Sequence, residues 1–306
     1  MNYQWYPGHM TKARRMMQED MKLIDLVIEL IDARIPFSSR NPDIDELGKN
    51  KQRLILLNKA DLADERRTEA WADYFRKKGF YVVKLDARAK NGMKTVGSMI
   101  AEACREKIER DRKRGIKNRP VRAMIVGIPN VGKSTFINTY AGKACAKTGN
   151  KPGVTRGKQW IRLNKDVELL DTPGILWPKF DDQMIGLRLA VTGAIRDEIL
   201  QTEEMALWLI GYMRKNYPGM LKQRYLIAED GGTEENSSPE NAEEVSGEWK
   251  KAEVALLAEI ARVRGCRLKG DVPDYAKAAQ LLIDDFRSGR LGRISLEEPE
   301  DAEKTK

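Results

Sequence analysis

The feature that most constrains the fold is an eight-residue motif, Gly127-Ile-Pro-Asn-Val-Gly-Lys-Ser134, which fits the pattern GxxxxGK[ST]. It follows an apolar run over Ala123–Val126 and precedes a helical pattern over Ser134–Tyr140. A glycine-rich turn between a buried strand and a helix lets backbone N–H groups curl around a phosphate, and the helix N-terminus adds favourable potential. The motif therefore predicts an α/β protein with a phosphate loop.

The residue types within this loop predict specific contacts to a nucleotide. Lys133 is expected to reach the β- and γ-phosphates and to assist catalysis, and Ser134 is expected to bind Mg²⁺. The nucleotide contacts expected from this segment are Asn130, Val131, Gly132, Lys133, Ser134 and Thr135. The motif alone does not distinguish ATP from GTP.

The segment Asn58-Lys59-Ala60-Asp61, which closes an apolar run over Arg53–Leu57, makes that distinction. A carboxylate at Asp61 can accept hydrogen bonds from both N1–H and the exocyclic amino group of guanine, whereas adenine would leave the charge unpaired. Hydrogen bonds to charged groups contribute about 1.5–3 kcal/mol each, so the discrimination is strong. Lys59 is expected to lie along the base, and Asn58 to tie this loop to the phosphate loop.

A third loop, Asp86-Ala87-Arg88, follows the predicted strand Tyr81–Leu85. Its position predicts that Asp86 and Ala87 contact the base. A plain turn at the end of the strand explains the same residues almost as well.

Two further segments are candidates for the parts of the site that respond to the γ-phosphate. Asp171-Thr-Pro-Gly174 follows the predicted strand ending at Leu170, and Pro152–Arg156 contains a threonine, Thr155. Such segments order on GTP and relax after hydrolysis. We expect Mg²⁺ ligands at Ser134, Thr155 and Asp171, and a γ-phosphate contact from the Gly174 amide.

Isoleucine at position 175 stands where many small G proteins have a glutamine that orients the attacking water. Hydrolysis must then use another group or one supplied by a partner. His9 is the single histidine of the chain. A lone histidine is usually structural, but the vacant catalytic position and the turn at Pro7-Gly8 make His9 a candidate.

Strand and helix patterns alternate over the first part of the chain. Helical patterns cover Arg66–Lys78 and Thr95–Arg112, and a mostly parallel sheet is predicted. The predicted strands are Leu26–Ile31, Arg53–Leu57, Tyr81–Leu85 and Val121–Val126, with a hairpin of Gln159–Leu163 and Asp166–Leu170 turning at Asn164-Lys165.

Helical spacing dominates after Pro178, as in Met205/Leu209/Met213. We therefore expect a GTPase domain over residues 1–178, a smaller all-helical domain over 179–292 and an acidic tail over 293–306. A stretch rich in Gly, Ser, Asn, Pro and Glu, 229–248, predicts a disordered acidic insertion in the helical domain.

The net charge of +9 over 306 residues favours polyanionic partners. Two basic stretches, one around Lys12, Arg14 and Arg15 and one over Arg105–Arg122, are candidates for RNA contact, although charge runs are usually solvated helix faces. No apolar run approaches the roughly 20 residues that cross a membrane, so no membrane partner is expected. The three cysteines form no CxxC pair, and no secretion signal is visible, so a cytoplasmic location is expected.

The order of these motifs is rotated relative to ordinary small G proteins, because Asn58–Asp61 precedes Gly127–Ser134 and Asp171–Gly174 comes last. In this order the sequence resembles the circularly permuted GTPases that assist assembly of the large ribosomal subunit, of the ribosome biogenesis GTPase A (YlqF) type. The resemblance also rests on the segments Trp5-Tyr-Pro-Gly-His-Met10, Asp32-Ala-Arg-Ile-Pro36 and Asp285-Phe-Arg287 with Leu291-Gly292.

The resemblance implies a permuted G domain followed by a helical RNA- or ribosome-binding domain. It also implies slow GTP hydrolysis stimulated by the large-subunit (50S) precursor, which is bound with GTP and left after hydrolysis, and a catalytic part for His9. Asn130 matches an asparagine of potassium-stimulated relatives, which implies K⁺ beside Mg²⁺. A monomer is expected. The insertion at 229–248 departs from the family pattern.

Two other functions fit the residues. The basic surface permits a GTP-dependent switch for another RNA or protein partner. A non-catalytic GTP-binding scaffold fits Ile175 but not the intact Lys133 and Ser134.

Overall fold

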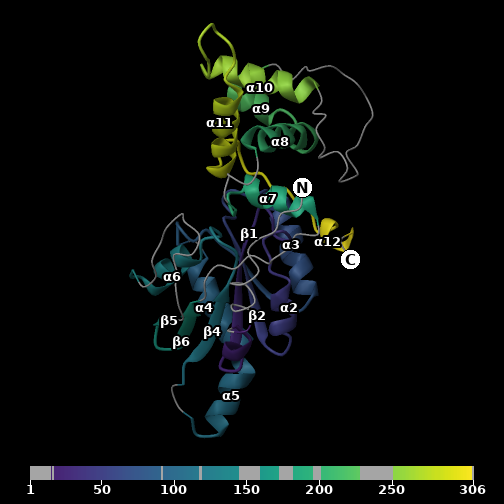
Figure 1. Cartoon of the computed structure of the whole chain (residues 1–306). Helices are drawn as coiled ribbons and strands as arrows, with labels where there is room; N and C mark the ends of the chain where they lie inside the picture. The colour runs from purple at the N-terminus through teal and green to yellow at the C-terminus, as the bar shows by residue number, and fades with distance from the viewer. Residues whose placement is uncertain are drawn as a thin grey trace. The chain divides into compact units, whose positions relative to one another are not determined.

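The structure, a computed structural model, describes residues 15, 17–90, 92–116, 119–144, 159–171, 182–195, 201–227 and 251–304. The chain divides into two compact units, one formed by Met1–Phe180 with Glu297–Lys306 and the other by Asp181–Leu296. The first unit holds a six-stranded sheet in the order β3-β2-β1-β4-β6-β5 (Figure 1). Its strands are β1 Leu26–Asp32, β2 Gln52–Asn58, β3 Tyr81–Lys84, β4 Val121–Val126, β5 Gln159–Arg162 and β6 Val167–Asp171.

Five of these strands are parallel, and only the edge strand β5 runs antiparallel to its neighbour β6. The predicted mostly parallel α/β fold and the hairpin at Asn164-Lys165 are therefore confirmed. Parallel strands end at the same edge of a sheet, so the loops after β1, β2, β3 and β4 meet there although their order along the chain is rotated.

The centre of the sheet is covered on both faces. Successive side chains of a strand point to opposite faces, and all seven residues of β1 are buried. On one face Ile31 packs with Trp71 and Phe75 of α3 (Glu65–Lys77). On the same face Val27 packs with Ile44 of the short helix α2 (Asp43–Leu47), which the sequence patterns did not indicate.

The helical pattern over Thr95–Arg112 is confirmed, but the structure divides it into two helices, α4 (Met93–Ala103) and α5 (Arg105–Lys113). The break falls at Cys104, where φ is −103° and ψ is 8°. The physical reason is a change of environment: α4 buries Val96 and Ile100, whereas α5 buries no residue. Apolar periodicity thus ends at the break while helix-forming charged residues continue. The phosphate-loop helix α6 spans Lys133–Ala141.

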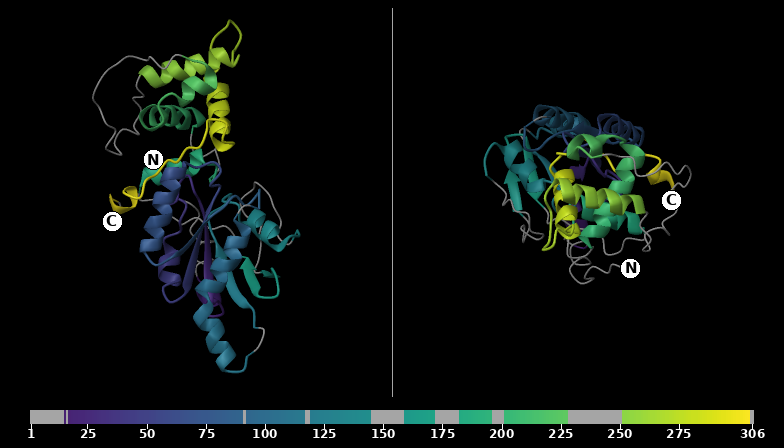
Figure 2. Two further views of the ribbon diagram at one scale, coloured as in Figure 1. Left: turned by 180° about the vertical axis from the view of Figure 1, so that it is seen from behind. Right: turned by 90° about the horizontal axis from the view of Figure 1, so that it is seen from above.

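The described part of the second unit is helical, as predicted, apart from one isolated bridge between Arg267 and Pro273 (Figure 2). Helix α8 buries Met205, Leu209 and Met213 at the predicted spacing. Within the part of the chain that the structure describes, every helix is too short or too polar to pass through a bilayer. The helices are α7 Gln183–Val191, α8 Thr202–Asn216, α9 Met220–Tyr225, α10 Lys251–Val263 and α11 Tyr275–Arg287.

The segment Asp285-Phe-Arg287 has a structural task in this unit. The buried carboxylate of Asp285 accepts hydrogen bonds from Arg224 Nε at 2.8 Å and from the Tyr225 hydroxyl at 3.1 Å. The Arg287 guanidinium donates to the carbonyl oxygens of Ala190 at 2.7 Å and Val191 at 3.0 Å. These bonds link α7, α9 and α11 to one another.

The residues predicted as an acidic tail are divided between the units. Residues 297–304 belong to the first unit and include a short helix, α12 (Asp301–Lys304). Ala302 is buried in the same apolar cluster as Trp71. Part of the predicted acidic tail is therefore packed against the first unit, because one face of this segment contacts α3.

Candidate nucleotide-binding site

The phosphate loop connects β4 to α6, and its backbone requires glycine at two positions. Gly132 has a φ of +102°, and a Cβ there would lie 2.5 Å from Nδ2 of Asn58. A Cβ on Gly127 would lie 2.5 Å from the carbonyl oxygen of Leu30. Asn130 has a φ of +57°, which asparagine tolerates better than most residues. The loop is thus folded tightly against the ends of β1 and β2.

Lys133 is held over this loop. Its Nζ donates hydrogen bonds to the carbonyl oxygens of Gly127 at 2.8 Å and Ile128 at 3.2 Å, and the residue is buried. The ammonium group therefore lies on the inner side of the turn, where the backbone amides of a phosphate loop face the phosphates of a ligand.

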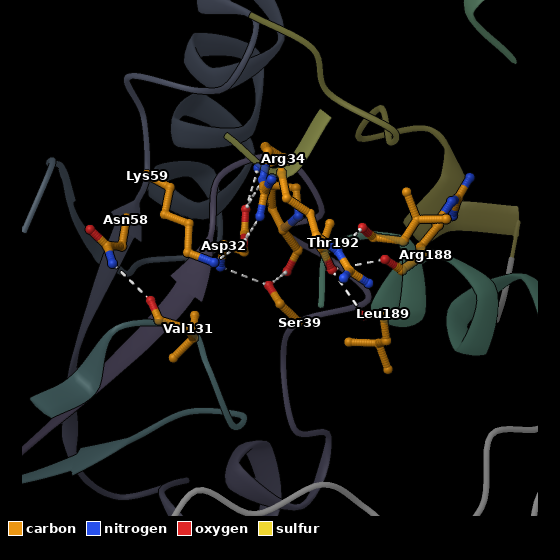
Figure 3. Close-up of polar contacts among 12 residues, drawn as sticks. Asp32, Arg34, Ser39, Asn58, Lys59, Val131, Arg188, Leu189 and Thr192 are labelled. Atoms are coloured by element: carbon orange, nitrogen blue, oxygen red, sulfur yellow. Dashed lines mark hydrogen bonds and ion pairs between the residues drawn. The ribbon is translucent and has the colours of Figure 1, made fainter. Parts of the chain in front are cut away.

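Asn58 joins three loops. Its Nδ2 donates to the carbonyl oxygen of Val131 at 2.7 Å, and its Oδ1 accepts from the backbone N–H of Ala87 at 3.0 Å (Figure 3 shows the first bond). Asn58 is only 3% exposed. The bond to the phosphate loop is the one that the sequence predicts, whereas the bond to Ala87 was not foreseen. One side-chain amide thus fixes the three loops with respect to one another.

Lys59, which is partly buried, contacts a buried ion pair of Asp32 and Arg34 (Figure 3). Its Nζ lies 2.8 Å from Oδ2 of Asp32, and the Arg34 guanidinium binds the same carboxylate through Nε at 2.9 Å and Nη2 at 2.8 Å. Sequence reasoning missed this partner, because Asp32 entered only as part of a motif. The cluster anchors the end of the Lys59 side chain beside the loop after β1.

The electrostatics of this cluster favour the ionised carboxylate. Burial alone would raise the pKa of Asp32, but the charges of Arg34 and Lys59 and their hydrogen bonds outweigh it, so the pKa lies well below its usual range. Burial also lowers the pKa of Lys59, and the Asp32 charge opposes that shift.

Asp32→Asn should destabilise the first unit in a pH-dependent way. At about pH 7 the variant leaves Arg34 and Lys59 without their anion, which costs about 3 kcal/mol of unfolding free energy. A carboxyl with a lowered folded-state pKa contributes stability that is fully present above its unfolded pKa of about 3.9 and is lost as pH falls toward the folded value. The difference in unfolding free energy between wild type and variant should therefore become smaller below about pH 4. Urea unfolding across this pH range measures the difference. A difference that stays constant with pH would contradict a lowered pKa for Asp32.

Asp61 and Arg88 form an ion pair between the second and third loops. Arg88 Nη2 donates to Oδ2 of Asp61 at 2.8 Å, and both side chains are partly exposed. The backbone N–H of Arg88 donates to Oδ1 of Asp86 at 2.9 Å, which is an Asx-type turn. Asp86 therefore shapes its own loop, and Arg88 occupies an oxygen that we expect guanine to use.

Arg88→Ala should strengthen GDP binding by up to about fivefold. An exposed ion pair contributes about 0–1 kcal/mol, and guanine would no longer displace it. Titration with a fluorescent GDP analogue measures the change, and Arg76→Ala, which removes two exposed ion pairs on α3, is the matched control. Weaker binding of the Arg88 variant would mean that Arg88 positions Asp61 instead of competing for it.

The residue types expected at the Mg²⁺ site are compatible with that ion where they are described. Ser134 lies in the first turn of α6, and backbone pairing sets residue 171 opposite Ile125, two residues before Gly127. Hydroxyl and carboxylate oxygens are ligands that Mg²⁺ prefers. Three other predicted site residues lie outside the described residues: His9, Thr155 and Gly174.

A buried carboxylate from the far end of the sequence supports this edge of the sheet. Glu297 is 1% exposed, and its carboxylate accepts from the backbone N–H groups of Phe37 at 2.7 Å and Ser38 at 3.1 Å and from the Ser38 hydroxyl. The same loop supplies the Ser39 hydroxyl, which accepts from the backbone N–H of Asp32 at 3.0 Å. No sequence signal distinguished Glu297 from its acidic neighbours.

Comparison with known proteins agrees with this geometry. A family profile described as "50S ribosome-binding GTPase" matches residues 122–224. The chain is 48% identical to ribosome biogenesis GTPase A of Bacillus cereus, with 97% of this chain and 94% of that protein covered. It is 34% identical to mouse mitochondrial ribosome-associated GTPase 1, with 96% and 89% covered.

Solved structures give the same result. The GDP-bound structure of YlqF from Thermotoga maritima matches with a TM-score of 0.62 and 27% identity, covering 94% of this chain and 100% of that one. The GNP-bound YlqF structure matches with a TM-score of 0.61 and 28% identity, covering 94% and 99%. The loop 58–61 and the phosphate loop lie at one sheet edge, and relatives match over almost the whole length, so the chain belongs to the ribosome biogenesis GTPase A family of GTPases.

Proposed function

We propose that this GTPase assists a late step of large (50S) ribosomal subunit assembly in the cytoplasm. As a monomer it binds the precursor particle with GTP and leaves after hydrolysis. The observation that carries the proposal is the near-complete similarity to proteins named ribosome biogenesis GTPase A, combined with a guanine-type site whose loops are tied together by Asn58.

Each part of the site has a role in this proposal. Asp61 accepts hydrogen bonds from guanine, with Lys59 along the base and the Asp86-Ala87 loop beside it. Lys133 and the amides of the phosphate loop hold the β- and γ-phosphates. Ser134, Thr155 and Asp171 would hold Mg²⁺, which neutralises charge on the phosphates when bound. Asn130 is the residue through which K⁺ would act.

The partner side of the proposal rests on charge. The net charge of +9 favours ribosomal RNA as the surface that the protein binds, through contacts to phosphates that give affinity without sequence choice. We assign the helical unit to this contact as well. Part of the basic stretch Arg105–Arg122 is occupied by internal ion pairs, since Lys107 Nζ lies 3.0 Å from an Asp25 carboxylate oxygen.

Sucrose-gradient sedimentation tests the proposal. Purified protein is mixed with ribosomal particles in the presence of either a non-hydrolysable GTP analogue or GDP. We expect co-sedimentation with large-subunit precursors in the analogue alone, and stimulation of GTP turnover by the same particles. Absence of both effects overturns the proposal, and sedimentation with another RNA or protein assembly would favour a different partner.

His9→Ala should leave nucleotide affinity nearly unchanged and lower particle-stimulated turnover by about a hundredfold or more. Isoleucine at position 175 cannot orient water, and a positioned histidine contributes about 10²–10⁴-fold in proton-transfer steps. Single-turnover hydrolysis with and without particles measures the effect. Unchanged stimulated turnover would exclude a catalytic part for His9.

A further inference from the structure

The outer strand of the sheet presents an exposed tryptophan between arginines. Among the tryptophans that the structure describes, Trp160 alone is exposed, at 42%, whereas Trp71 is fully buried. Trp160 lies on β5, the edge strand, which is labelled beside β6 in Figure 1. Large aromatic side chains are usually buried, so an exposed indole at a sheet edge is a candidate contact point.

The register of the strands explains why the indole is presented there. Trp160 pairs with Leu170 of β6, and Leu170 pairs with Met124 of β4. Leu170 and Met124 belong to one buried apolar cluster on this face of the sheet. Met124, Leu170 and Trp160 therefore form a row across the three strands, which begins in the core and ends at the exposed indole.

The next row on the same face carries charge. Arg122 of β4 pairs with Glu168 of β6, which pairs with Arg162 of β5. The guanidinium carbon of Arg122 lies 5.4 Å from the centre of the Trp160 ring, and its Nε lies 3.6 Å from the Glu168 carboxylate. Arg162 is exposed, and its Nε donates a hydrogen bond to the carbonyl oxygen of Asn164 at 3.4 Å. The Arg122 guanidinium thus lies over the indole, and the strand register places Glu168 and Arg162 in the row next to it.

We propose that Trp160, Arg122 and Arg162 form a site for unpaired RNA, in which a base stacks on the indole and the guanidinium groups contact the flanking phosphates. Aromatic rings beside cations are the common way in which proteins hold single-stranded nucleic acid, because every base offers a π-face and every linkage a negative charge. The excess of positive charge in the row favours RNA over an acidic or apolar protein segment. The inference rests on the proposed function, and it names the form of RNA that this face takes.

Fluorescence anisotropy with a labelled single-stranded oligouridylate, and with a matched RNA duplex, tests the site in the full-length protein. Trp160→Ala should weaken single-strand binding by about fivefold to a hundredfold, and Trp160→Phe should retain most of it, since a benzene ring still stacks. Arg122→Ala and Arg162→Ala should each lower the slope of log affinity against log salt by about 0.7. Lys78→Ala is the matched control, because Lys78 Nζ lies 4.2 Å from the Tyr74 ring centre on α3. Basal GTP turnover should be unchanged in Trp160→Ala, which also verifies folding.

The inference is overturned if wild type and Trp160→Ala bind the single strand equally well. It is also overturned if Trp160→Ala loses as much affinity for the duplex as for the single strand. Loss of particle binding with intact oligonucleotide binding assigns Trp160 to a protein contact and also overturns it. These outcomes are separate from the sedimentation test. If wild type and Trp160→Ala sediment with the precursor equally well, the proposed function stands. If wild type does not sediment with it, the oligonucleotide experiment alone decides whether the Trp160 site binds RNA.

Discussion

Asp61→Asn should weaken GDP and GTP binding by about 10²- to 10⁴-fold. Two hydrogen bonds from guanine to a charged carboxylate contribute about 1.5–3 kcal/mol each. The asparagine amide is uncharged and can accept only one of them. The same variant should bind xanthine nucleotides better than wild type does, because xanthine offers a carbonyl oxygen where guanine has an amino group. Competition against a fluorescent GDP analogue measures both effects.

Asp64→Asn is the control for lost charge. Asp64 lies three residues further along, and its carboxylate caps α3 by accepting from the backbone N–H of Arg67 at 2.9 Å. Asparagine caps a helix about as well as aspartate, so this variant should bind nucleotides like wild type. Unchanged base preference in Asp61→Asn, or a preference of wild type for ATP, would remove the basis of the guanine site.

Glu297→Ala should lower the unfolding free energy of the first unit by about 3–5 kcal/mol, because each hydrogen bond to the charged carboxylate contributes about 1.5–3 kcal/mol. The variant leaves the backbone N–H groups of Phe37 and Ser38 without their acceptor in a buried position, and such groups cost free energy when unpaired. For a unit of this size about 1 kcal/mol corresponds to roughly 2–4 °C, so the midpoint should drop by about 6–20 °C. Thermal unfolding followed by circular dichroism measures the drop.

Glu298→Ala separates this effect from a general loss of acidic charge. Glu298 is half exposed and its carboxylate lies 2.6 Å from Arg67 Nη2, and an exposed pair contributes about 0–1 kcal/mol. Nucleotide affinity should fall in Glu297→Ala as well, because the loop that it supports carries Arg34. Equal midpoints for the two variants would show that the buried carboxylate does not hold the loop.

The sequence predicts most of the sheet because its strands are short apolar runs with clear ends. Tyr81–Lys84 and Val121–Val126 appear within one residue of their predicted bounds. The exact position of the break at Cys104 was not predictable, because residues with good helix propensity lie on both sides of it, in 101–103 and in 105–107. Short helices such as α2 lack enough periodicity to be identified at all.

The motifs predict which residues belong to the candidate site, but they do not predict the internal partners of those residues. GxxxxGK[ST] and NKxD identify Lys133 and Asp61 because a ligand fixes their spacing. The bonds of Lys59 to Asp32 and of Asp61 to Arg88 depend on which loops the sheet brings together. Glu297 lies in an acidic run in which each residue looks like the next, and only tertiary packing distinguishes it.

The contact between Glu297 and Phe37 spans 260 positions of the chain. Contacts between residues so far apart in sequence form late, since the loop that they close is long and its entropy must be lost before the bond is gained. During synthesis from the N-terminus, the strands of the sheet emerge well before residue 297 exists. The sheet edge with the candidate nucleotide site therefore lacks this contact until the whole helical unit has been translated. A chain that stalls within that unit would have a formed sheet whose loop at Phe37 is not yet held by Glu297.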